Sequence, residues 1–398
     1  MTVELPTTSL LTPPTMEDGG RTLLPWLREM RDEHPVWRDA YGIWHVFRYA
    51  DVAQVISDAQ VFSSNTVRVV PAAQRFSAGN LLQTDPPRHH TLRRLVGSAF
   101  SPKIVTGLAP RIAEVTHELL DATGGSGEFD LVPALAYPLP VIVIAELLGL
   151  PTSDRELFRT WADKLLDREV ADPNDPELTQ KIDRVTADML AYLHEHCADR
   201  RAHPRQDLIS RLAAVEADGE RLSDEEVVNF SIVLLMAGHI TTTALLGNTV
   251  LCLDEHPEVC AGLHADRSLV PAALEEVLRY RSSFTQVGRV TMTETELAGQ
   301  AIPADAFISP WLLSANRDER EFPDPDRFDI HRNPHHLAFG HGIHFCIGQL
   351  LARVEGRIAV GVLLDRYAQI RLTPGVPLRF FRRGIFAART IPVTVQHV

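Results

Sequence analysis

The chain has 398 residues and is 45% hydrophobic, which is enough for one large or two medium domains around a substantial buried core. Its formal net charge of -13 disfavours nucleic acid as a partner, because phosphate binding draws on clustered Lys and Arg. Four cysteines lie far apart without a CxxC pair, which argues against a disulfide framework and fits a reducing cytoplasm. The opening "MTVELPTTSLLTPP" lacks the basic residues and apolar run of a signal peptide, so we expect a cytoplasmic protein.

Helical patterns dominate the chain and strands are few. We expect a mobile segment over residues 1–20, followed by a single domain over residues 21–398 that is mainly α-helical with a small β portion. A β-hairpin is predicted over residues 36–48, because two strand-like runs flank a turn at residues 39–42. Short strands around turns are predicted over residues 294–311.

Two apolar stretches have the length of a membrane span. Residues 131–151 are interrupted by internal prolines and an acid, so we interpret them as a loop that enters a core helix. Residues 231–254 hold His239, Asn248 and several threonines, and a helix that is apolar on nearly every side belongs inside a large protein. We therefore expect no membrane insertion.

A glycine-rich loop around Cys346 is the most unusual feature of the sequence. It belongs to the stretch "LAFGHGIHFCIGQLLARVEG", residues 337–356. Gly340, Gly342 and Gly348 let the backbone approach closely on both sides of the cysteine. The helix that is predicted to follow points its positive end at the sulfur, and such surroundings stabilise a thiolate.

The thiolate could serve as a nucleophile or as a metal ligand. A nucleophile would require a histidine base and an orienting group, and no partner motif appears elsewhere, so a metal ligand is favoured. A thiolate bound to haem iron fits this isolated cysteine. Zinc stays open as an alternative, although one thiolate with loop histidines matches no ordinary zinc spacing, because four histidines lie upstream: His335, His336, His341 and His344.

The cysteine loop resembles the haem-binding signature of the cytochrome P-450 family. The resemblance extends over essentially the whole chain: "EEVLR" supplies the family's ExxR pair, Glu276 and Arg279, and "DPDRF" supplies a third charge, Arg327. It implies the cytochrome P-450 fold, haem b (iron protoporphyrin IX) as cofactor, and a structural role for the three charges. The matching loop residues are Phe339, Gly340, Gly342, His344, Cys346 and Gly348, with Cys346 as the metal ligand.

Haem carries two propionates, which require cationic or hydrogen-bonding partners where they are buried. The resemblance implies that these partners are His89, Arg93, Arg289 and His344. On a helix, His89 and Arg93 are four residues apart and share one face.

The family's long central helix crosses the opposite face of the haem. The segment "AGHIT" is similar to the family's oxygen-binding pattern (A/G)Gx(D/E)T, so Ala237, Gly238 and Thr241 are expected to face bound O₂, with Thr241 catalytic. In isolation, Thr241 would be interpreted as a threonine that only hydrogen-bonds to the carbonyl of residue 237. Ile240 stands where the family has an acid, which puts the usual proton route in doubt. His239 lies almost opposite on the helix and is expected to pack behind it.

The resemblance implies a monooxygenase that inserts one oxygen atom of O₂ into a C–H bond of a large apolar natural product, by hydroxylation or epoxidation. The layout is similar to that of actinobacterial enzymes that modify macrolide antibiotic intermediates. Electrons are expected from a ferredoxin and its reductase, and a locally basic surface should receive the ferredoxin through Arg94, Arg353 and Arg357.

The substrate is expected to contact three variable segments, residues 62–84, 160–182 and 284–287. Two alternatives from other classes remain open. One is a haem-thiolate sensor or ligand carrier without oxidation, and the other is a zinc-dependent hydrolase that uses the histidine cluster with Cys346.

Overall fold

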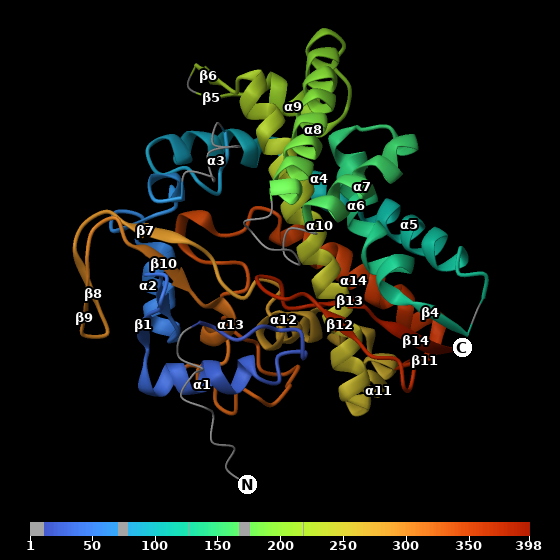
Figure 1. Cartoon of the computed structure of the whole chain (residues 1–398). Coiled ribbons are helices and arrows are strands. Elements are labelled where there is room, and N and C mark those ends of the chain that lie inside the picture. The colour runs from blue at the N-terminus through green and yellow to red at the C-terminus, as the bar shows by residue number, and fades with distance from the viewer. Residues whose placement is uncertain (1–11, 71–78, 126, 167–175, 218) are drawn as a thin grey trace.

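The computed structural model describes residues 12–70, 79–125, 127–166, 176–217 and 219–398 (Figure 1). Within them helices predominate and the β portion is small, which confirms the expected fold class. The helices are α1 (Leu23–Glu33), α2 (Tyr49–Ser57), α3 (Arg88–Ala99), α4 (Pro102–Gly107), α5 (Ala109–Asp121), α6 (Pro138–Leu148), α7 (Arg155–Leu166), α8 (Pro176–Ala202), α9 (Leu208–Ala214), α10 (Asp224–Glu255), α11 (Pro257–Ala265), α12 (Val270–Tyr280), α13 (Leu312–Ala315) and α14 (Gln349–Arg366).

The strands are short and fall into separate sheets. They are β1 (Val36–Arg38), β2 (Trp44–Val46), β3 (Phe62–Ser63), β4 (Glu128–Asp130), β5 (Glu216–Ala217), β6 (Glu220–Arg221), β7 (Arg289–Thr291), β8 (Thr295–Leu297), β9 (Gln300–Ile302), β10 (Phe307–Pro310), β11 (Tyr367–Leu372), β12 (Arg379–Phe380), β13 (Ala388–Thr390) and β14 (Pro392–His397).

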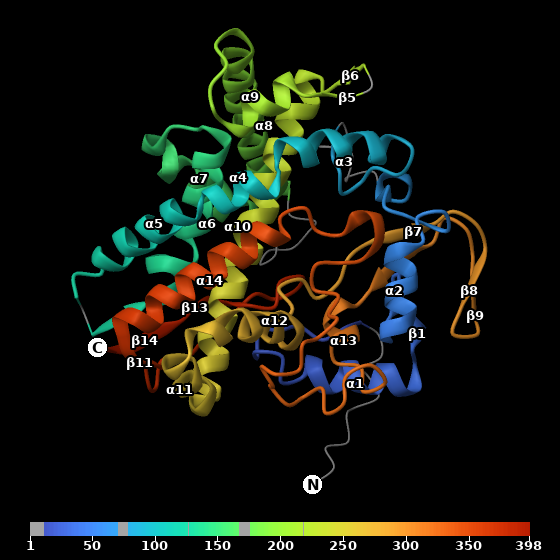
Figure 2. The same ribbon diagram turned by 180° about the vertical axis from the view of Figure 1, so that it is seen from behind.

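Helix α10 is the axis around which other helices pack. It begins with a capping box in which the Ser223 hydroxyl accepts from the Glu226 N–H and the Glu226 carboxylate accepts from the Ser223 N–H. It contacts α6, α8, α12 and α14, and Figure 2 shows α14 lying across it between α5 and α12. By length and composition α10 could cross a membrane, but 67% of its most apolar window is buried inside the protein. It packs as a core helix does.

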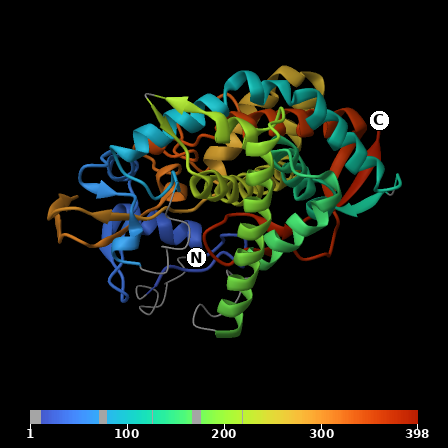
Figure 3. The same cartoon turned by 90° about the horizontal axis from the view of Figure 1, so that it is seen from above.

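The largest sheet among the described residues has the strand order β1-β2-β10-β7-β3. Strands β1 and β2 form the predicted hairpin, with Val36 opposite Val46, and β8 to β10 are the short strands predicted over residues 294–311. Figure 3 shows this sheet and the β8–β9 ribbon on one side of the molecule, and β11, β14 and β4 on the other.

The packed part of the chain begins before Gly20, so the predicted boundary there is too late. Met16 is only 2% exposed and lies in a core cluster with Trp26 and Phe47. Its N–H donates to the Arg382 carbonyl at 2.9 Å. One apolar residue in a stretch rich in Pro and Thr produces no periodic pattern, so the sequence does not indicate this packing. The remainder of the predicted segment, residues 1–11, lies outside the described residues.

Glu276 and Arg279 form a buried ion pair, as the resemblance implied. Both side chains are fully buried, and Arg279 donates to Glu276 through Nε at 2.8 Å and Nη2 at 2.7 Å. The prediction that Arg327 supplies the third charge is wrong: its side chain is exposed, and it meets the pair only through its carbonyl, which accepts from Arg279 at 3.3 Å and from Arg332 at 3.2 Å. The third charge is Arg332, whose Nε lies 3.4 Å from Glu276 Oε1.

The buried ion pair supports the cysteine loop. Arg279 also donates to the Asn316 carbonyl at 2.9 Å, and the Asn316 side-chain oxygen accepts from the Leu337 N–H at 2.7 Å, where the loop begins. A short chain of hydrogen bonds therefore connects α12 to the segment that carries Cys346.

Candidate active site

The cysteine loop holds Cys346 between fixed backbone groups. The Cys346 N–H donates to the Phe339 carbonyl at 2.9 Å, and α14 begins three residues later, with Gly348 as its N-cap. Gly342 has φ +69, and a Cβ there would lie 2.8 Å from the Ser57 Cα, so only glycine fits this close approach. The loop is thereby pressed against α2.

The backbone N–H groups of Gly348 and Gln349 donate to the Cys346 sulfur. Burial nevertheless raises the pKa of the Cys346 thiol, and it outweighs these N–H groups and the positive charges of Arg93 and Arg353, which lower it. The expectation that the loop alone stabilises a thiolate is therefore only half right. The donors are in place, but a metal ion bound to the sulfur is needed to deprotonate the thiol outright.

Beside the cysteine loop, two imidazoles and two guanidiniums from three parts of the chain converge. His89 and Arg93 come from α3, Arg289 from β7 and His344 from the loop itself. The rings of His89 and His344 are 4.4 Å apart between centroids. Arg93 Nη2 donates to the Phe345 carbonyl, which places this cluster directly next to the cysteine.

Buried atoms of this cluster have no partner within the described part of the chain: both ring nitrogens of His89, and His344 Nε2. Burial, helped by the positive charges around them, lowers the pKa of His89 to about 4 and of His344 to about 3. Burial also lowers the pKa of Arg289 to about 10. The positive groups of this cluster disfavour one another's protonation, and several of their buried nitrogens lack a hydrogen-bond partner within the described residues. Buried anions placed here would accept these hydrogen bonds and balance the positive charge.

This donor set fits haem. One thiolate ligand lies beside a cluster able to hold two carboxylates, and a metal in a flat ring with peripheral carboxylates requires this combination. The zinc alternative lacks its ligands: in the described ranges no group of three or more His, Cys, Asp or Glu side chains could hold a metal ion. His335 and His341 are exposed, and His336 Nε2 is instead 3.2 Å from a Glu275 carboxylate oxygen.

Helix α10 presents one open face in its middle. Val233, Met236, Ala237 and Thr241 are partly or fully exposed in a stretch that is otherwise almost entirely buried, and their spacing of three, four and eight residues places them on a single face. The Thr241 hydroxyl donates to the Ala237 carbonyl at 2.7 Å, so its oxygen can still accept a hydrogen bond from the open side. Thr241 is the one polar side chain of this set.

Gly238 also has a packing role, and its predicted place beside bound O₂ stays a prediction. A Cβ built on it would lie 2.5 Å from Ile144 Cδ1, so the missing side chain lets α6 pack closely against α10.

His239 packs behind the helix, which confirms the prediction. It is 3% exposed, and its ring meets the Tyr137 ring edge-on at a centroid distance of 4.5 Å. Burial lowers its pKa to about 4, so it is neutral near pH 7. Ile240 lies in a small apolar cluster with Phe381 and Ile385.

Glu355 is a buried acid near the oxygen side that no motif in the sequence indicated. This residue of α14 is 1% exposed, and it is hydrogen-bonded to Thr242, the neighbour of Thr241. Burial raises the pKa of its carboxyl to about 8, so it is largely protonated at neutral pH. The signal was a lone acid on the apolar face of the helix, between the buried residues Val354 and Gly356.

The arginines expected to form the basic surface are not equivalent. Arg94 and Arg357 have exposed side chains. Arg353 is paired with Glu275 at 2.6 Å and lies over the Phe339 ring at 4.5 Å. Arg353 therefore holds α14 to α12 and the loop, and its charge is largely compensated. Of the expected substrate segments, residues 71–78 and 167–175 lie outside the described residues.

Known proteins resemble this chain in sequence and structure. The Cytochrome P450 sequence profile matches residues 164–382. Erythromycin C-12 hydroxylase of Saccharopolyspora erythraea is 48% identical over 375 residues, covering 93% of this chain and 94% of the relative. Cyclomarin C epoxidase CymV of Salinispora arenicola is 46% identical over 386 residues, covering 96% and 98%. The ligand-free structure of cytochrome P450 TbtJ1 matches with a TM-score of 0.91 at 51% identity, covering 97% of this chain and 100% of that one.

The relatives and the solved structure match nearly the whole length of the chain, the profile matches more than half of it, and all agree with the haem-suited donors found around Cys346. The chain belongs to the cytochrome P450 family.

Proposed function

We propose that the protein is a haem b monooxygenase that takes electrons from a ferredoxin and hydroxylates or epoxidises a large apolar natural product, a macrolide intermediate. The observation that carries the proposal is the cluster of His89, Arg93, Arg289 and His344 with unpartnered buried nitrogens next to Cys346. For hydroxylation, the substrate C–H bond, O₂, two electrons and two protons give C–OH and water. The haem supplies the redox and oxygen-transfer chemistry when it is bound.

Each residue of the cysteine side has a distinct task. Cys346 Sγ would hold the iron, with the N–H groups of Gly348 and the following residue limiting its negative charge. The Phe339 carbonyl accepts a hydrogen bond from the Cys346 N–H, and Gly340, with φ +70, allows the chain to turn within the loop. The four-residue cluster beside the loop would hold the propionates.

On the oxygen side, the Thr241 hydroxyl would accept and relay a proton. Ala237 and Gly238 are small residues, which would leave space for O₂ beside the helix. With Ile240 in place of an acid, we assign the proton source to Glu355, a protonated carboxyl hydrogen-bonded to Thr242. Water between the two threonine hydroxyls would complete the path.

The substrate class is proposed from the open face of α10 and from the relatives. Val233, Met236 and Ala237 offer apolar contacts, as a large apolar ring requires. Two relatives carry the names of erythromycin and cyclomarin C modifying enzymes, and both cover nearly the whole chain. A macrolide is therefore the first substrate to test.

The electron donor is expected on the cysteine side. The half-exposed ring of Phe345 directly precedes Cys346, and Arg94 and Arg357 supply exposed positive charge on α3 and α14. An acidic ferredoxin would complement this surface, although the chain as a whole has a net charge of -13. We expect the protein to act in the cytoplasm, where such donors are reduced.

The proposal is tested on the purified protein. Its reduced carbonyl complex should show the strongly red-shifted absorption band of thiolate-ligated haem, and Cys346→Ala should abolish that band. Supplied with ferredoxin, its reductase and a panel of macrolide intermediates, the wild type should release a product that has gained one oxygen atom. A haem-loaded protein that binds such compounds but oxidises none would instead be a sensor or carrier.

A further inference from the structure

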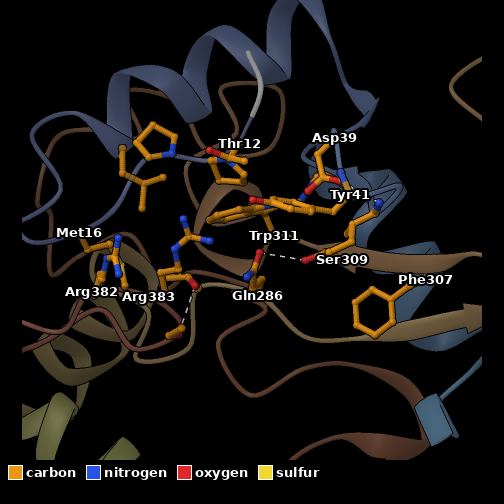
Figure 4. A pocket seen from close by; sticks show the side chains of 17 residues that line it. Thr12, Met16, Asp39, Tyr41, Gln286, Phe307, Ser309, Trp311, Arg382 and Arg383 are labelled. Atoms are coloured by element: carbon orange, nitrogen blue, oxygen red, sulfur yellow. Dashed lines mark hydrogen bonds and ion pairs between the residues drawn. The ribbon is translucent and has the colours of Figure 1, made fainter. Parts of the chain in front are cut away.

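A second cavity, of about 140 Å³, lies apart from the site described above. Its walls come from the N-terminal segment, the β1–β2 hairpin, β10, the loop between β12 and β13, and residues 285–286, which belong to the expected substrate segment 284–287; none of its lining residues belongs to α10 or the cysteine loop. Figure 4 shows Arg382 and Arg383 on one side of this cavity, Asp39 and Tyr41 on the other, and Trp311 between them.

The arginine side carries positive charge with little compensation. Arg382 approaches a carboxylate oxygen of Glu17 only at 3.9 Å, and Arg383 makes no hydrogen bond or ion pair within the part of the chain that the structure describes. Gly384, with φ +76, turns the loop, and its carbonyl accepts from the Thr285 N–H at 2.9 Å. Two adjacent guanidiniums on a fixed loop attract an anion.

The Asp39 carboxylate on the opposite side of the cavity is already hydrogen-bonded to its own neighbours. Asp39 is 8% exposed, and its Oδ1 accepts from the N–H groups of Tyr41 and Ile43, each at 2.9 Å. Trp311 Nε1 donates to His45 Nδ1 at 3.0 Å, so the neutral His45 ring carries its proton on Nε2 and donates it to Asp39 Oδ2 at 3.2 Å. Asp39 therefore already accepts three hydrogen bonds from its own neighbours, and the uncompensated charge at the cavity lies on the arginine side.

The remaining walls select among anions. Phe307, Trp311 and Ile43 are apolar, and Gln286 Oε1 accepts from Ser309 at 2.9 Å, which leaves the Gln286 amide N–H₂ as a further donor. The volume corresponds to about five water molecules at about 30 Å³ each, enough for a carboxylate on a short apolar arm. The planar guanidinium matches a carboxylate in a two-bond geometry.

We propose that this cavity binds a carboxylate carried on a short apolar arm, either as part of the substrate or as a separate small acid. Two contacts connect this cavity to the active site and would transmit the effect of binding. Ile385, beside Gly384, packs in the apolar cluster of Ile240, and Ser283, two residues before Thr285, donates to the Thr241 carbonyl at 3.0 Å. The binding itself is independent of the proposed function, and only its consequence for the reaction rests on that function.

The test titrates hexanoate into the haem-loaded protein by calorimetry, with hexanamide as the neutral probe. Hexanoate should bind saturably without moving the haem absorption band, and hexanamide should bind at least about fivefold more weakly. The double variant Arg382→Gln/Arg383→Gln should weaken hexanoate binding by at least the same factor, about fivefold. Arg379→Gln, which removes one positive charge at an exposed residue of β12 outside the cavity, should leave it unchanged.

Three results would overturn the proposal: no saturable binding of hexanoate, equal binding of hexanamide, or unchanged affinity in the double variant. Repeating the titration with a saturating macrolide distinguishes the two sources of the carboxylate. Competition would assign the cavity to an acidic arm of the substrate, and simultaneous binding would assign it to a separate acid. If hexanoate binds as expected but the wild type oxygenates none of the tested compounds, the proposed function is rejected and the proposal for this cavity stands.

Discussion

The cysteine side and the oxygen side of the candidate site are built in different ways. On the cysteine side, Cys346 is held by backbone groups, glycine contacts and a chain of hydrogen bonds from Arg279. On the oxygen side, the open face of α10 carries one hydroxyl, Thr241, among apolar residues. The first side is a rigid scaffold that many contacts determine, so damage to it should affect folding and cofactor retention. The second depends on a few groups, so damage there should affect chemistry alone.

The largest effect is expected from Arg279→Met, which leaves the Glu276 carboxylate buried without its partner. Removing one member of a buried pair costs about 3–5 kcal/mol, so the variant should lose most of its stability or fail to retain haem. Urea unfolding and haem content measure this. Arg332→Met, which removes one 3.4 Å contact, should cost less, and Arg327→Met should cost almost nothing. A larger loss in Arg327→Met than in Arg332→Met would restore Arg327 as the third charge.

Thr241→Ala should separate chemistry from folding. The variant keeps the helix, because threonine contributes only a hydroxyl bonded to the Ala237 carbonyl. Haem content and substrate affinity should stay close to wild type, while product per electron pair falls and hydrogen peroxide rises. A proton-relaying group is typically worth about 10²- to 10⁴-fold, so the loss should be plain. Unchanged product per electron pair would remove Thr241 from the proton path.

The pH dependence of stability should report on the propionate partners. Because burial lowers the pKa of His89 to about 4 in the folded chain, the unfolded chain binds more protons below about pH 6.5. The haem-free protein should therefore lose stability as pH falls from about 6.5 towards 4. Bound propionates favour the protonated ring, so the haem-loaded protein should lose less.

Urea midpoints between pH 7 and pH 5 measure this difference. The haem-free His89→Gln variant should show a flatter profile than the haem-free wild type, since it lacks the group whose protonation favours unfolding. Parallel profiles for the haem-free and haem-loaded wild type would argue against propionates beside His89.

The two sides also differ in how far the sequence predicts them. On the cysteine side, the loop motif and the family resemblance indicated Cys346 and four cationic or imidazole residues, which the structure brings close together, and their roles toward haem stay predictions. Three features required the packing of distant segments: the ion pair of Arg332 rather than Arg327, the contact of Gly238 with α6, and the burial of Glu355. A helix wheel gives the direction of a side chain, but it does not show which neighbour lies in that direction.

The smallest effect is expected from His239→Phe, although a histidine next to the missing acid is the obvious candidate for a proton relay. Its ring lies on the buried side of α10 against Tyr137, and burial lowers its pKa to about 4, so near neutrality it is a neutral imidazole and not the imidazolium that would donate a proton. Phenylalanine preserves the aromatic contact. Product per electron pair should therefore stay within about twofold of wild type, far from the loss expected when a relay is removed.

Glu355→Gln is the matched comparison, because it keeps the shape of a buried side chain beside Thr242 and removes its ionisable proton. If the proton path runs from this carboxyl through the two threonine hydroxyls, Glu355→Gln should release clearly more hydrogen peroxide per electron pair than His239→Phe, at equal haem content and substrate affinity. The reverse order would place the relay on the opposite side of α10. It would also mean that α10 must rotate or unwind in the working enzyme, because His239 and Thr241 lie on different sides of the helix.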